Sequence, residues 1–212
     1  MEIIVDVTGV VCETGSRRFS GLRCLLALIV SLFAQSLAPA AHAQESVVQL
    51  DAAQTKIDFT LGDVLHTVHG IFKLKSGTIR FDPGAGMASG AIIVDATSGD
   101  SGNGSRDHRM HREILESSKF TEITFVPRQV KGTLSPQGSS QMEVSGQFQL
   151  LGQDHELTLP IEIQADGRQL EFKTRFIVPY VQWGLKNPST FILRVNDKVT
   201  IDIHAVAHIV SQ

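Results

Sequence analysis

Residues 199–209 read Val-Thr-Ile-Asp-Ile-His-Ala-Val-Ala-His-Ile and form the longest alternating run of the chain. Successive side chains of a β-strand point to opposite faces, so the apolar series from Val199 to Ile209 shares one face. Asp202, His204 and His208 fall on the other face. This one-sided pattern is typical of antiparallel sheet with a single buried surface, and it indicates an all-β fold.

Similar alternation recurs from residue 47 onward. The runs that show it span residues 57–61, 68–74, 79–81, 144–150, 157–163 and 170–178. Turn residues such as Asp82-Pro83-Gly84 separate several of them. About eight strands of this kind could form a sandwich or a closed barrel, and closure would remove exposed strand edges.

Residues 105–117 break the alternation. Met110, Ile114 and Leu115 recur there at near-helical spacing among charged residues. We therefore predict one short helix, which follows a Gly-rich loop at residues 99–104.

Residues 1–43 have the features of a secretory signal peptide. Arg17, Arg18 and Arg23 precede an apolar run at 24–34, and the segment ends in Ala-His-Ala at 41–43. The run is too short to cross a bilayer, which takes about 20 helical residues. We expect cleavage after Ala43, a domain at 44–212, a periplasmic or secreted location and no stable membrane span. The residues before Arg17 are unusual for a signal, so we also expect a translation start downstream of Met1.

The charge and cysteine content exclude several function classes. The chain has 19 Lys and Arg against 22 Asp and Glu, a net charge of −3. This balance does not indicate a strongly basic surface of the kind that binds nucleic acid or an anionic membrane. Both cysteines, Cys12 and Cys24, lie in the predicted signal segment. A processed chain would therefore have no disulfide, no thiolate metal site and no cysteine nucleophile.

Several short motifs occur in a distinctive order. They are Gly70-x-Phe72, Gly77-x-Ile79-x-Phe81-Asp82, Gly102-Asn103-x-x-Arg106-Asp107 and Val144-x-Gly146-x-Phe148-x-Leu150-x-Gly152. Their order and spacing resemble the YceI-like family, secreted lipocalin-like proteins associated with polyisoprenoid binding. The resemblance implies an eight-stranded antiparallel lipocalin-like barrel with a cavity for an isoprenoid or acyl chain. It implies no catalytic residue, no enzyme activity and no cofactor.

If the barrel holds such a cavity, inward aromatic residues are the candidates for its wall. These are Phe59, Phe72, Phe125, Phe148, Phe172 and Phe176. Taken singly, each is as compatible with a packed core as with a pocket, because an eight-stranded barrel is just wide enough for either.

The main concentration of cations in the predicted helix comprises Arg106, Arg109, Arg112, His108 and His111. A guanidinium group can bind two oxygens of a phosphate or carboxylate at once. Arg106 or Arg109 is therefore a candidate for an anionic lipid head group at the barrel mouth. The alternatives are a solvated helix face with its own carboxylates, or an Arg106–Asp107 pair that fixes the helix to the barrel.

Three histidine pairs leave open a metal-binding or metal-assisted stress protein. They lie at residues 66 and 69, 108 and 111, and 204 and 208. On a strand, His66 and His69 would point to opposite faces, and the last pair would point outward, so surface histidines are the preferred interpretation. A filled barrel that acts as an interaction module without a small ligand is a third hypothesis. The lone Trp183 lies in a loop that could cap the pocket, plug the barrel end or support a homodimer.

Overall fold

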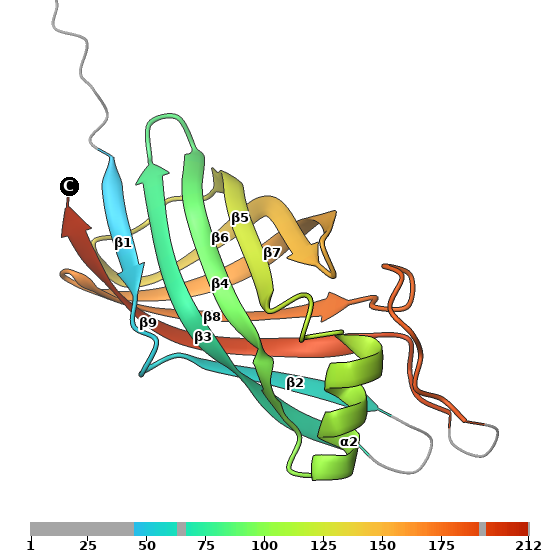
Figure 1. Ribbon diagram of the computed structural model, residues 1–212. Helices are drawn as coiled ribbons and strands as arrows, with labels where there is room; N and C mark the ends of the chain where they lie inside the picture. The colour runs from blue at the N-terminus through green and yellow to red at the C-terminus, as the bar shows by residue number, and fades with distance from the viewer. Residues whose placement is uncertain (1–44, 63–66, 191–193, 212) are drawn as a thin grey trace, which may run out of the picture. The chain divides into compact units, whose positions relative to one another are not determined.

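The computed structural model describes residues 45–62, 67–190 and 194–211, and all of these belong to one compact unit (Figure 1). The predicted signal peptide and its cleavage site lie outside the described residues. Among the described residues, no helix is long and apolar enough to span a membrane.

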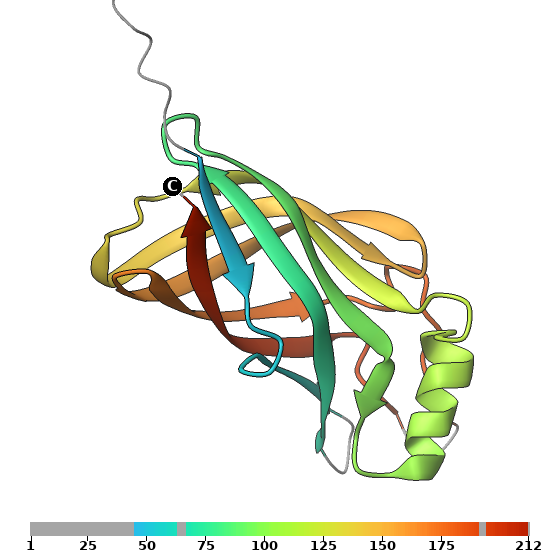
Figure 2. The same cartoon turned by 60° about the vertical axis from the view of Figure 1, so that its left-hand side comes forward.

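The described residues form nine strands. They are β1 (Ser46–Leu50), β2 (Lys56–Gly62), β3 (Thr67–Asp82), β4 (Met87–Asp100), β5 (Glu122–Lys131), β6 (Gln137–Leu150), β7 (Gln153–Asp166), β8 (Gln169–Val178) and β9 (Val199–Ser211). Their order in the sheet is β1-β3-β2-β9-β8-β7-β6-β5-β4, and a further pairing of β3 with β4 closes the sheet into a barrel. Figure 2 shows the strands wrapping around the barrel.

Strands β1 and β2 occupy one position in this barrel. Both pair antiparallel with β3 and with β9, β1 toward one end and β2 toward the other. Asp51 lies in the break between them, where its carboxylate accepts hydrogen bonds from the backbone N–H of Ala53 (2.8 Å) and from the Gln54 side chain (2.6 Å). Such a turn interrupts a strand, so the nine strands make an eight-stranded antiparallel barrel, and the predicted fold is confirmed.

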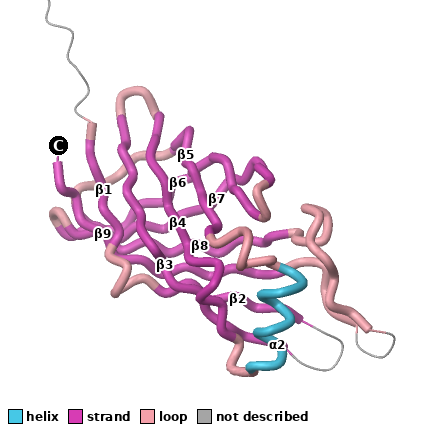
Figure 3. Tube along the Cα trace, viewed as in Figure 1, coloured by secondary structure: helices cyan, strands magenta, loops and turns pink. Residues whose placement is uncertain are grey.

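The predicted helix is also present. It begins as α2 (Gly104–Arg109) and continues as a π-helical turn, η1 (Met110–Ile114). The side chain of Asn103 caps its first turn by accepting a hydrogen bond from the Arg106 N–H at 3.1 Å. Figure 3 shows the helix at one end of the barrel.

The apolar interior divides into two clusters. At one end, which we call the filled end, small and medium side chains pack closely; they are Val48, Met142, Ile163, Ala165, Leu170, Ala207 and Ile209. At the other, the cavity end, the buried residues are Leu115, Phe125, Leu150, Leu159, Phe176, Val178, Tyr180 and Leu185. The long alternating run of β9 serves both, because Ile201 and Ile203 pack at the cavity end and Ala207 at the filled end.

Candidate ligand cavity

The cavity end contains a partly open hollow of about 520 Å³. Aliphatic and aromatic side chains of β2, β3, β8 and β9 form a large part of its wall, including Ile57, Phe59, Leu61, Phe72, Phe176, Val178, Val199, Ile201 and Ile203. Other strands and the helix add further apolar residues, among them Phe148 and Leu150 of β6 and Met110 and Ile114 of the helix. The volume falls within the range of roughly 300–1,000 Å³ that is usual for small-molecule sites.

Four of the six predicted phenylalanines lie on this wall. Phe59 and Phe72 form a pair with ring centroids 5.3 Å apart, and Phe148 and Phe176 form an edge-on pair at 6.4 Å. Phe125 belongs to the same buried cluster behind the wall. Phe172 instead packs against the filled end, because its position along β8 lies beyond the cavity.

Two glycines keep the aromatic rings against the wall. A Cβ atom at Gly70 would fall on the Phe59 ring and lie 2.6 Å from the carbonyl oxygen of Asp100. A Cβ atom at Gly99 would lie 2.7 Å from the Phe72 ring. Because these positions carry no side chain, the rings can lie flat on the strands and leave the centre of the barrel open.

Hydrogen bonds fix the helix over one side of the cavity. Arg106 donates from Nε to Ser101 Oγ and from its terminal nitrogen to the Ser101 carbonyl oxygen, both at 2.7 Å. The Asp107 carboxylate accepts from the Ser101 N–H at 2.9 Å and from the Ser101 hydroxyl. Burial raises the pKa of Asp107, but the hydrogen bonds from Ser101 outweigh it and the pKa is lowered. Arg106 lines the cavity, yet its hydrogen bonds hold the helix in place.

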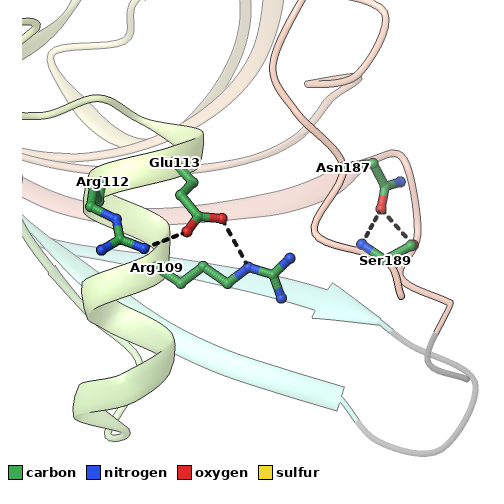
Figure 4. A network of polar contacts seen from close by, with 5 residues as sticks. All are labelled: Arg109, Arg112, Glu113, Asn187 and Ser189. Atoms are coloured by element: carbon green, nitrogen blue, oxygen red, sulfur yellow. Dashed lines mark hydrogen bonds and ion pairs between the residues drawn. The ribbon is translucent and has the colours of Figure 1, made fainter. Parts of the chain in front are cut away.

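Arg109 also lines the cavity and lies one turn along the helix. Its Nε donates to Glu113 at 3.2 Å, while Arg112 donates to the other carboxylate oxygen of Glu113 at 2.7 Å (Figure 4). Both hydrogen bonds lower the pKa of Glu113, and the one from Arg112 has the larger effect. The guanidinium of Arg109 extends toward the loop that carries Asn187 and Ser189. Two arginines therefore share one carboxylate at the edge of the cavity.

The loop after β8 closes the remaining side, and sequence periodicity did not identify its contribution. Tyr180, Leu185, Pro188 and Val195 line the cavity from this loop. The Tyr180 hydroxyl donates to the carbonyl oxygen of Asn196 at 2.6 Å, and burial raises the pKa of Tyr180 to about 12.

Trp183, in the same loop, packs against the inner face of the barrel wall. Its ring stacks on that of His155 in β7, with centroids 4.2 Å apart and planes 7° from parallel. It also contacts Phe148 of the cavity wall, at a centroid distance of 5.6 Å.

The histidines are dispersed. His111 bonds the Gly99 carbonyl oxygen through Nε2 (2.8 Å) and Ser117 Oγ through Nδ1 (3.0 Å), so it fixes the helix to β4. His204 and His208 are exposed, as their register predicted, and His66 lies outside the described residues. In the part of the chain that the structure describes, no group of three or more His, Cys, Asp or Glu residues could hold a metal ion.

A comparison with protein-family models matches residues 48–207 to the YceI-like domain. The chain belongs to the YceI-like family. The resemblance inferred from the sequence motifs is thus confirmed. No curated protein matches the chain significantly.

Solved structures share the fold of this YceI-like chain at low sequence identity. BcnA of Burkholderia cenocepacia is 18% identical with a TM-score of 0.61, over 74% of this chain and 98% of BcnA. A polyisoprenoid binding domain from Saccharophagus degradans is 14% identical with a TM-score of 0.57, over 76% of this chain and 98% of that domain. These similarities support the barrel architecture.

Proposed function

We propose that this YceI-like protein is an exported carrier that binds an isoprenoid or other long apolar chain in the barrel cavity. The observation that carries the proposal is a deep, partly open apolar hollow at one end of a barrel whose other end is packed. The polyisoprenoid binding described for the Saccharophagus degradans domain supports the choice of ligand class. The signal-peptide features at residues 1–43 support export to the periplasm or beyond.

The energetics suit a carrier. Burial of an apolar chain contributes about 0.8 kcal/mol per methylene, so ten buried carbons give a gross gain of roughly 8 kcal/mol. Loss of translational freedom and ordering of the chain cost at least several kcal/mol of that gain. The net affinity is then modest, which permits release of the cargo.

We assign contact with an anionic head group to Arg109 rather than Arg106. Both line the cavity, but the donor groups of Arg106 are directed to Ser101. Arg109 shares Glu113 with Arg112, so this part of the helix carries a net positive charge beside the cavity. An anionic head group there would be stabilised by a charge-assisted hydrogen bond.

Mass spectrometry of an organic extract of the purified protein tests the proposal. We expect a stoichiometric lipid from the unmodified protein and its loss from the Phe148→Asp variant. A bound hydrocarbon chain would remove water from the carboxylate in the cavity wall, which is energetically costly. His204→Ala, on the exposed face of β9, is the matched control and should retain the lipid. Thermal melts would show that both variants fold. Equal lipid content in two folded variants, or no lipid in any protein, would contradict the proposal.

A further inference from the structure

The barrel wall has an opening between β7 and β8. Within the described residues, these strands pair only where Glu162–Asp166 faces Gln169–Lys173. Each strand continues in register with its other neighbour: β7 pairs with β6 back to Gln153, and β8 pairs with β9 as far as Val178. Residues 153–161 and 174–178 therefore form two well-ordered edges that diverge from each other.

Proline explains why the ladder stops here. Continuation of the register would place Pro160 of β7 opposite Arg175 of β8. Proline has no backbone N–H to donate, and it is confined in sheets to edges and irregular positions. Pro160 therefore ends the pairing two residues beyond the last matched pair, Glu162 and Lys173.

A second hollow, of about 880 Å³, lies at this divergence. Outward-facing charged residues form its rim, including Asp58, Glu143, Glu162, Lys131, Lys173 and Arg175. Met142 and Ile161, which pack in the barrel interior, also line it. Ile203 is thus common to the walls of the charged outer groove and the apolar cavity.

One of the residues that line the groove, Thr174, has a buried polar atom without a partner in the described part of the chain. Thr174, the first residue of β8 beyond the paired segment, has its Oγ1 buried without a hydrogen-bond partner among the described residues. Buried hydroxyl groups are normally satisfied, and an unsatisfied one requires an explanation. Thr174 lines the groove, so this unpaired polar atom lies directly behind that part of the wall.

The Trp183 ring packs on the part of β7 that does not pair with β8, at His155. The contacts that hold this ring to the wall are the stack on His155 and the contact with Phe148. At the helix, by contrast, His111 is hydrogen-bonded to the Gly99 carbonyl oxygen of β4, and Arg106 donates to Ser101 in the loop that follows β4. The Trp183 ring is thus held to the wall by aromatic packing, whereas directed hydrogen bonds also hold the helix.

We propose that the opening between β7 and β8 is a side entrance to the cavity, through which the apolar chain enters and leaves. The tail passes Ile203 into the cavity while the polar end remains in the charged groove, and Trp183 moves aside. This inference rests on the proposed carrier function, to which it adds the route of ligand exchange.

A bulky label at the groove tests the entrance. In a chain with Cys12→Ser and Cys24→Ser, Arg175→Cys would be labelled with a polyethylene-glycol maleimide. The probe is cis-parinaric acid, a polyene fatty acid that fluoresces when it leaves water, supplied in phosphatidylcholine vesicles. We expect uptake at least about tenfold slower, with the final occupancy unchanged, because a label on the entrance alters passage and not the cavity.

The matched control is His108→Cys with the same label, since His108 is exposed on the helix and is not among the residues that line the cavity or the groove. Uptake by this protein should change less than about twofold, and Trp183→Ala without any label should exchange the probe several-fold faster. Equal rates for the two labelled proteins, or slower uptake with the His108 label alone, would overturn the side entrance while leaving the carrier function intact. Absence of probe uptake by the unlabelled protein would instead overturn the carrier function.

Discussion

The two ends of the barrel use the same alternating strands to opposite effect. At the filled end, the small residues Ala165 and Ala207 flank Leu170 on the two neighbouring strands, and Leu170 packs there with only 1% of its surface exposed. At the cavity end, phenylalanine rings lie against the wall opposite glycines and leave a hollow. The distribution of small residues along the strands, rather than the amount of apolar surface, decides which end is solid.

Truncation of a core side chain at the filled end should have the largest effect on stability. Leu170→Ala should lower the free energy of unfolding by about 2–5 kcal/mol, the usual cost of a new cavity in a packed core. The measurement is urea unfolding of the lipid-free protein. Ile201→Ala, on the cavity wall, is the matched variant and should cost roughly half as much or less, because its side chain already faces open space on one side. Equal losses would mean that the cavity end is as closely packed as the filled end.

A methyl group at Gly70 should affect both stability and capacity. Gly70→Ala would push the Phe59 ring from the wall toward the cavity, and we expect a loss of about 1–3 kcal/mol from this overpacking. The displaced ring should also reduce the amount of bound lipid. Chemical denaturation and lipid extraction measure the two effects.

Gly104→Ala serves as the control for this prediction, since nothing lies within 4 Å of a Cβ atom at that position. It should leave stability and lipid content nearly unchanged. If Gly70→Ala behaved in the same way, the close approach of the ring to β3 would not be what holds the cavity open.

The sequence predicted the strands and their faces well, because alternation directly reports which side of a strand is buried. It could not predict how far along the barrel axis each inward residue lies. Phe172 and Phe176 lie on the same face of β8, yet one packs at the filled end and the other on the cavity wall. Their separation in space depends on strand tilt and pairing with distant strands, which a local pattern does not contain.

The same limit applies to the irregular parts of the wall. The divergence of β7 from β8 is a property of their register, and Pro160 alone indicates only that the ladder is interrupted nearby. Tyr180 and Leu185 line the cavity from a loop without periodicity, so no pattern singled them out. The start of the helix was easier to predict from the sequence. Asn103 caps the first turn, and Arg106 and Asp107 both form hydrogen bonds with Ser101 in the loop before the helix.

Acid should selectively weaken the helix at the cavity end, and this is the smallest effect that we predict. The pKa of Asp107 is lowered in the folded protein, so its carboxylate stabilises the fold above the ordinary aspartate pKa of about 4, and this contribution is lost as the pH falls through the lowered value. Asp107→Asn should therefore melt below the unmodified protein at pH 7, with a difference that shrinks below about pH 4. Glu113→Gln, which changes an exposed ion pair on the same helix, should give a smaller difference at pH 7 because solvent screens it. A difference for Asp107→Asn that stayed constant from pH 7 to pH 3 would show that the charged carboxylate does not hold the helix over the cavity.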